Sequence, residues 1–192
     1  LGGSDSDVDI TKHSVDVVSQ TSSIVQEKQV LFEDQKEVSI ELEANGLESK
    51  SNEANIREME FNCILSNLLV NSIDAIITKG ENGKVEVSVE KSEDAFILKV
   101  SDNGIGIKDE DLKNIGKYRK TLKANGNGLG LYSSIHFLKK RGGTFNIESQ
   151  YGQGTQVTIT IPIANSDDKR IQVKQDGLLV VLDDDYIVHE SI

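Results

Sequence analysis

A single long amphipathic segment, residues 57–78, constrains the fold of this chain more than any other feature of the sequence. Apolar side chains recur along it at helical spacing and gather on one broad face. That face consists of Phe61, Ile64, Leu65, Leu68, Ile73 and Ile76, with the small Ser72 among them. Because such a face must be covered by a second layer, the segment predicts a helix packed against a sheet.

Strands are predicted where apolar and polar residues alternate, at 38–42, 85–89, 95–101, 144–149 and 155–162. The last four are expected to form two antiparallel hairpins. Helices are also predicted at 14–32 and 131–140, and Gly142-Gly143 ends the second because glycine tolerates the left-handed conformation of helix ends. The predicted fold class is α+β, a two-layer sandwich of a mixed, mostly antiparallel sheet with helices on one face.

The composition, with 36% hydrophobic and 28% charged residues, is typical of one globular domain with short flanks. We interpret residues 1–13 as a lead-in, 14–164 as the domain, 165–177 as a linker and 178–192 as the start of a further unit. Because the chain begins with Leu1 and not Met, we expect it to be a piece of a longer protein.

The formal net charge of −11 argues against non-specific binding to nucleic acid or to an anionic membrane, because both need a basic surface. Cys63 is the single cysteine, so no internal disulfide can form and a reducing compartment fits. No signal sequence is visible, and no apolar run is expected to reach membrane-spanning length. We therefore expect a cytoplasmic location without direct membrane contact, although the parent chain could carry an anchor elsewhere.

The first motif lies within the long helix and contains Asn67, Asn71 and Asp74. Spacings of four and three residues place these side chains along one stripe beside the apolar face. Their oxygens and amides suit Mg²⁺ and phosphates. The alternative is an ordinary amphipathic helix whose polar side is rich in amides.

The second motif is Asp102-Asn103-Gly104-Ile105-Gly106, at the end of a predicted strand. A carboxylate there can accept a hydrogen bond from an exocyclic amine, and Gly104 and Gly106 let the backbone approach a flat ring closely. The alternative is a simple Asp-Asn-Gly turn.

The third motif opens a predicted helix and consists of Gly126, Asn127, Gly128, Leu129, Gly130 and Leu131. Such a loop directs backbone N–H groups at an anion, and the helix dipole adds to the attraction. Lys117, Arg119, Lys120 and Lys123 bring positive charge just upstream. No Walker-type Gly-Lys-Ser/Thr is present, and the alternative is a solvated loop.

Together and in this order, the three motifs resemble the N box and the two glycine boxes of the GHKL superfamily, which includes histidine kinases, DNA gyrase and mismatch-repair ATPases. The resemblance runs from about residue 35 to Pro162, and GNGLGLYSS with GGTFNIESQYGQGTQVTITIP is similar to the kinases in particular. It implies ATP and Mg²⁺ as ligands. Ser72 replaces the usual alanine, and IGKYRKTLK stands where many members carry a phenylalanine-rich lid box.

The resemblance also implies a role for each matching residue. Asn71 would be the Mg²⁺ ligand, Asn67 a catalytic residue near the phosphates, and Asp102 the acceptor for the adenine amine. Gly104 and Gly106 would line the base, with Thr155 near it on the closing strand. The remaining ATP contacts would come from Asp74, Arg119, Lys123 and the residues of the third motif, Gly126 to Leu131.

Asn67 distinguishes a kinase from a hydrolase. The hydrolysing branches commonly carry a glutamate there, which can activate water as a general base, whereas asparagine cannot take the proton. The resemblance then implies transfer of the γ-phosphoryl group to a histidine on a separate dimerisation domain of the same homodimeric kinase. None of His13, His136 and His189 lies in an acceptor motif, so we expect this chain to be inactive alone.

Two other functions stay open, a non-catalytic nucleotide-binding regulatory module and a GHKL ATPase. The tail from Gly177 resembles the first strand of a receiver domain, with Asp183 and Asp184 matching its acidic pair. That likeness implies a hybrid kinase with a receiver domain or response regulator as partner. An acidic linker after a short apolar strand is the alternative.

Overall fold

The computed structural model describes residues 14–34, 38–44, 52–117 and 128–164. Four helices lie in these residues, α1 (Val17–Leu31), α2 (Glu58–Lys79), α3 (Asp109–Leu112) and α4 (Gly130–Lys140). The strands are β1 (Val15–Asp16), β2 (Val38–Ala44), β3 (Glu53–Ala54), β4 (Gly83–Lys91), β5 (Ala95–Asp102), β6 (Thr144–Gln150) and β7 (Gly154–Pro162). The predicted lead-in, linker and receiver-like tail fall outside the described residues.

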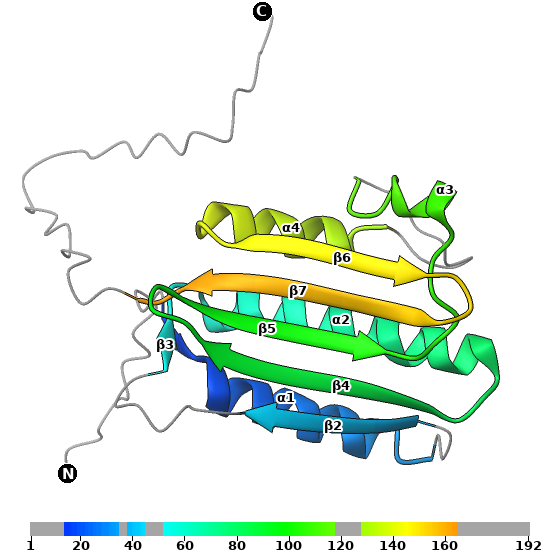
Figure 1. Cartoon of the computed structure of the whole chain (residues 1–192). Coiled ribbons are helices and arrows are strands. Elements are labelled where there is room, and N and C mark those ends of the chain that lie inside the picture. The colour runs from blue at the N-terminus through cyan, green and yellow to red at the C-terminus, as the bar shows by residue number, and fades with distance from the viewer. Residues whose placement is uncertain (1–13, 35–37, 45–51, 118–127, 165–192) are drawn as a thin grey trace, which may run out of the picture.

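Five strands form one sheet in the order β2-β4-β5-β7-β6. β2 runs parallel to β4, while the pairs β4–β5, β5–β7 and β6–β7 are antiparallel. Helices α1, α2 and α4 lie together on one face of this sheet (Figure 1). The predicted two-layer α+β sandwich is confirmed, including both hairpins and the mixed character of the sheet.

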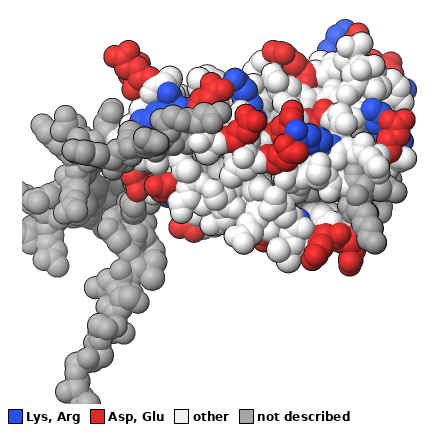
Figure 2. Space-filling model, turned by 60° about the horizontal axis from the view of Figure 1, so that its bottom comes forward, with Lys and Arg blue, Asp and Glu red and all other residues white. Residues whose placement is uncertain are grey.

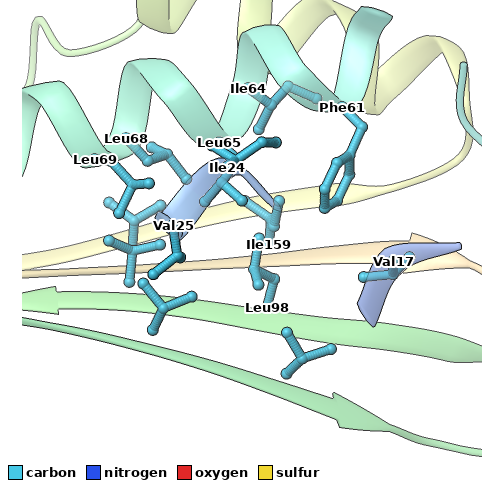
Figure 3. Close-up of a cluster of buried hydrophobic side chains, with 14 of the residues drawn as sticks. Val17, Ile24, Val25, Phe61, Ile64, Leu65, Leu68, Leu69, Leu98 and Ile159 are labelled. Carbon is cyan, nitrogen blue, oxygen red and sulfur yellow. The ribbon is translucent and has the colours of Figure 1, made fainter. Parts of the chain in front are cut away.

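The core lies between α2 and the sheet (Figure 3). Phe61, Ile64, Leu65 and Ile73 on α2 are fully buried. They meet the inward-facing side chains of the central strands, among them Leu98 on β5 and Ile159 on β7. Fully burying one such side chain stabilises the fold by about 1.5–3 kcal/mol. This packing fixes α2 across the sheet, and α2 carries the first predicted motif.

Both ends of α2 are defined by local capping contacts. At its start the Arg57 N–H donates to Glu60 Oε2 at 3.1 Å, and at its end Gly80 adopts the left-handed conformation with φ +73°. By length and composition α2 is apolar enough to cross a membrane, so the prediction that no segment reaches that limit was wrong. Its apolar face is instead buried against the sheet, as in the core helix of a globular domain.

Two short strands and one short helix were not predicted. β3 lies in a segment for which no helix or strand was predicted, and it pairs antiparallel with β1. Ala54 also forms a bridge with Ile163, so both ends of the described domain meet at β3. Because Asp16 accepts the Ser19 N–H at 2.8 Å and caps α1, this helix begins at Val17 and not at residue 14.

The sheet face that carries no helix is polar. Figure 2 shows acidic and basic side chains intermixed over the side where β2 lies. Lys84 Nζ lies 2.7 Å from a carboxylate oxygen of Glu41 and from one of Glu86, and Lys99 pairs with Glu90 at 3.0 Å. Exposed pairs of this kind contribute little to stability.

Candidate functional site

The first two predicted motifs touch where β5 ends beside α2. The Ile105 N–H donates to the Ala75 carbonyl at 3.0 Å. A Cβ added at Gly104 would lie 2.7 Å from both the carbonyl carbon and the Cβ of Ala75. Only glycine therefore fits at this point, and the strand end lies directly on the polar stripe of the helix.

Asp102 is the charged group of this junction. Burial raises the pKa of its carboxyl above the ordinary 3.8, against hydrogen bonds from the Gly104 and Thr155 backbone N–H groups and the Ser72 hydroxyl, and against the nearby positive charge of Lys79. The Gly104 N–H lies 3.0 Å from Asp102 Oδ1. The carboxylate is thus held in one orientation at the end of a buried strand, where it can accept a donor from a ligand.

The start of β7 completes this side of the site. Thr155 pairs with Asp102 across the sheet, and its hydroxyl lies 2.9 Å from that of Ser149. Ser149 also accepts the Ile107 N–H at 2.9 Å, so it fastens the loop after Asp102 to the β6–β7 hairpin. Gly106 has φ +68°, and an added Cβ would collide with the Gln150 carbonyl.

The third motif meets the first at Asn67. Asn67 Nδ2 donates to the Gly130 carbonyl at 3.2 Å and to Ser134 Oγ at 3.3 Å. A Cβ added at Gly130 would lie 3.1 Å from Asn67 Oδ1. The N-terminus of α4, where backbone N–H groups attract anions, is thereby placed beside the middle of α2. The N-cap residue, Leu129, makes no side-chain cap hydrogen bond.

The structure brings together most of the predicted site residues, in a single region along α2. Asn71 and Asp74 lie partly buried on α2 between Asn67 and the Ala75–Gly104 contact, and Gly128, Leu129 and Leu131 lie at the start of α4. Arg119, Lys123, Gly126 and Asn127 lie outside the described residues. His136 is exposed and stacks on Tyr132, with ring centroids 6.4 Å apart.

Ser149, described above, was missed from the sequence, as were Ser72, Ser134 and Lys79. Ser72 was noted only as a small replacement for alanine, yet its hydroxyl reaches Asp102. Ser134 donates to the Gly130 carbonyl at 2.9 Å, one turn along α4. Lys79 Nζ donates to the Asn103 carbonyl at 2.9 Å. Only Ser134 left a local signal, its spacing of four from Gly130, because the other contacts join distant segments.

The side chains of the site could bind Mg²⁺ only together with oxygens of a bound phosphate ligand. Among the residues that the structure describes, no three His, Cys, Asp or Glu side chains gather as a metal site. Asn71 and its neighbours on α2 offer amide and carboxylate oxygens instead. Mg²⁺ commonly takes only one or two ligands from a protein and the rest from phosphates and water. The residues present are therefore compatible with a magnesium–nucleotide complex.

Comparison with known families agrees with this geometry. Residues 57–165 match the family model described as histidine kinase-, DNA gyrase B-, and HSP90-like ATPase. The match covers more than half of the 192 residues and includes every predicted site residue.

Three curated kinases are similar to this chain in sequence. Sporulation kinases B and D of Bacillus subtilis (strain 168) are 32% and 36% identical to it over 96 and 103 residues. Sensor histidine kinase ZraS of Escherichia coli (strain K12) is 35% identical over 100 residues. The matches cover 50%, 54% and 52% of this chain but only 22%, 20% and 21% of those proteins, so the chain spans about a fifth of their length.

Solved structures share the fold. The catalytic domain of histidine kinase ThkA, in a nucleotide-free form, superposes with a TM-score of 0.63 and 23% identity, over 78% of this chain and 93% of that one. The mycobacterial sensor histidine kinase MprB gives a TM-score of 0.64 at 17% identity, over 78% and 95% of the two chains.

Proposed function

The chain belongs to the histidine kinase-, DNA gyrase B-, and HSP90-like ATPase family, and we propose on that premise that it binds Mg·ATP and donates the γ-phosphoryl group to a histidine on a separate dimerisation domain. Its kinase relatives support an ATP-binding role. The observation that carries the proposal is the meeting of three motifs along α2, with a buried carboxylate at one end and a glycine-rich helix start at the other.

Adenine is assigned to the Asp102 end of the site. The exocyclic amine of adenine would donate to Asp102, whose orientation is fixed by the Gly104 N–H. Gly104 and Gly106 allow the backbone to lie close to the flat base, and Thr155 borders it. A carboxylate accepts hydrogen bonds and donates none while ionised, so it favours the amine of adenine over the carbonyl oxygen that guanine carries at that position.

The phosphates are assigned to the other end of the site. Gly128 to Leu131 would offer backbone N–H groups at the start of α4, and Asn71 would hold Mg²⁺ together with the phosphates. Asp74 lies one turn further along α2. Arg119, Lys123, Gly126 and Asn127, which lie outside the described residues, are proposed to complete the phosphate contacts. Mg²⁺ would neutralise negative charge on the phosphates.

The reaction proposed is transfer to nitrogen without hydrolysis. An imidazole nitrogen of the acceptor histidine attacks the γ-phosphorus, a P–N bond forms, and the bond from the γ-phosphorus to the bridging oxygen breaks, releasing ADP. The proton displaced from the imidazole passes to solvent. Asn67 cannot act as a general base for water, so this chain would supply position and charge only.

The partners and location follow from the same proposal. The acceptor histidine would belong to the dimerisation domain of the parent kinase, which would act as a homodimer. A receiver domain or response regulator would take the phosphoryl group next. We infer a cytoplasmic location for this domain, because its ATP is found there.

Calorimetric titration with Mg·ATP tests the site. Asp102→Ala removes a charge-assisted hydrogen bond worth about 1.5–3 kcal/mol, so ATP affinity should fall roughly ten- to hundredfold. Asp94→Ala is the matched control, because Asp94 is exposed and lies just before β5, at the end of the strand away from Asp102. Unchanged affinity in Asp102→Ala would remove the adenine assignment.

A further inference from the structure

Helix α4 carries the proposed phosphate loop but is anchored by few buried side chains. Of its 11 residues only Ser134 and Leu138 are buried, and Leu131 and Phe137 are partly buried against the core. Because a helix this short is held by its tertiary contacts, each of them matters for its position. The polar contacts at the two ends of α4 add to its packing in fixing where its N-terminus lies.

The N-terminal contact of α4 belongs to the site itself. Asn67 Nδ2 donates to the Gly130 carbonyl at 3.2 Å, and Ser134 lies beside the same pair. This contact fixes the N-terminal end of α4 against α2. A second polar contact at the other end would further restrict the direction in which the helix N-terminus points.

The second attachment is an ion pair at the opposite end. Arg141, which follows α4, donates through Nε to Glu60 Oε2 at 2.8 Å and through Nη2 to Glu60 Oε1 at 3.1 Å. The two side chains are only 12% and 10% exposed. A bidentate arginine–carboxylate pair fixes distance and orientation together.

Glu60 is itself fixed on α2. Its Oε2 also accepts the Arg57 N–H at 3.1 Å, which caps the start of that helix. The pair therefore joins the first turn of α2 to the last turn of α4. Asn67 lies seven positions after Glu60 on α2, so the two attachments lie about two helical turns apart.

We propose that Glu60 and Arg141 are positioning residues for the nucleotide phosphates. By fixing the far end of α4, they hold the glycines at its start where the triphosphate would bind. This inference rests on the proposed function, because it assumes that phosphates lie at Gly128–Gly130. Neither residue touches the nucleotide.

The geometry separates this role from a general contribution to stability. Adenine is assigned to Asp102, Gly104 and Thr155, and these residues lie on β5, the loop after it and β7. Asp102 is hydrogen-bonded to Gly104, to Thr155 and to Ser72 of α2, and Thr155 is hydrogen-bonded to Ser149 of β6. Loosening α4 should therefore weaken phosphate binding and leave adenosine binding unchanged.

The test compares the affinities for Mg·ATP and for adenosine in Glu60→Gln and Arg141→Lys. Glutamine can still accept the Arg57 N–H and keep the cap of α2. Lysine keeps the positive charge but cannot form the bidentate pair with the carboxylate. ATP affinity should fall about tenfold, because the N–H groups at the start of α4 would no longer be held against the phosphates, while adenosine affinity stays within twofold of wild type. Glu90→Gln is the control, because Glu90 pairs with Lys99 on the open sheet face.

Amide exchange without nucleotide gives a second, independent readout. In both variants the N–H groups of Ser133 and Ser134 should exchange faster than in wild type, while those of β5 are unchanged. Equal losses of ATP and adenosine affinity, or unchanged ATP affinity, would overturn the positioning role. So would unchanged exchange at the start of α4. If the wild-type protein bound Mg·ATP no more tightly than adenosine, the phosphate assignment would be overturned and this inference with it.

Discussion

At the scale of single residues, the site combines a buried carboxylate, Asp102, with a carboxamide, Asn67, whose nitrogen donates to the protein. Burial raises the pKa of Asp102, so its ionised form is less stable in the folded chain than in the unfolded one. Asn67 has its amide hydrogens directed at acceptors of the protein, the Gly130 carbonyl and Ser134 Oγ. A carboxyl whose pKa is shifted by burial, as that of Asp102 is, is typical of functional sites.

The role of Asn71 can be separated from general binding by removing the metal. Asn71→Ala should weaken ATP binding by about 1.5–3 kcal/mol in Mg²⁺, because a ligand to a charged group is lost. The loss should be much smaller in EDTA. Calorimetry in the two buffers measures the difference, with Asn62→Ala on the same helix as control, since Asn62 contacts Gln20 of α1. Equal losses in Mg²⁺ and EDTA would contradict the ligand role.

The lowered pKa of Glu60 predicts how the free energy of unfolding changes with pH. Burial alone would raise the pKa of Glu60, but the hydrogen bonds and charge of Arg141 and the Arg57 N–H outweigh it and lower the pKa below the ordinary 4.5. An acid whose pKa is lower in the folded state stabilises the fold above its unfolded pKa. This stabilisation should be complete above about pH 4.5 and disappear as the pH falls through the lower, folded value.

The acid response is measured by urea unfolding of wild type and Glu60→Gln between pH 7 and pH 3. The free energy of unfolding of the wild type should fall more steeply below pH 4.5 than that of the variant, which has no group to protonate at this position. Parallel curves would show that Glu60 does not carry this dependence.

The same scale shows what the sequence could and could not predict about the site. Asp102 and Gly104 were predicted because both belong to one short motif at a strand end. Ser72 could not be assigned to Asp102, since 30 residues separate them and only the fold brings them together. The Glu60–Arg141 pair was missed for the same reason, as its members are 81 residues apart.

At the scale of elements, the sequence predicted those features that depend on neighbouring residues alone. Strict alternation and short turns specified both hairpins, and both are present. The parallel pairing of β2 with β4 is not encoded in either strand alone, because it depends on the crossover through α2. The two-residue strands β1 and β3 are too short to show any period, and they were missed.

The contact between the β5 loop and α2 gives a prediction at this scale. Gly104→Ala places a Cβ 2.7 Å from the Ala75 carbonyl carbon, so backbone must move. We expect a loss of about 1–3 kcal/mol in stability from the overpacking, together with weaker adenosine binding. Gly152→Ala is the control, because its Cβ would meet nothing within 4 Å, although φ +84° makes alanine unfavourable there as well. Thermal unfolding should respond in both variants, and calorimetry with adenosine only in Gly104→Ala.

At the scale of the whole molecule, the site and the ends of the domain lie at different places along α2. The described residues begin and end beside β3, where Ala54 pairs with Val15 and bridges to Ile163, close to the start of α2. Asp102 and the Ala75–Gly104 contact lie near the other end of that helix. The two ends of the described domain therefore lie away from the proposed adenine site.

The central claim, that this domain donates a phosphoryl group and does not hydrolyse ATP, is tested most directly with γ-labelled ATP. The chain is incubated with labelled Mg·ATP alone and together with the histidine-bearing domain of its parent kinase, and protein-bound phosphate and free phosphate are both measured. Alone, the chain should neither label itself nor release appreciable inorganic phosphate. With the acceptor domain present, label should appear on that domain's histidine as acid-labile phosphate, and Asp102→Ala should reduce it. Robust labelling of His13, His136 or His189, steady release of inorganic phosphate by the chain alone, or an unlabelled acceptor domain would contradict the account.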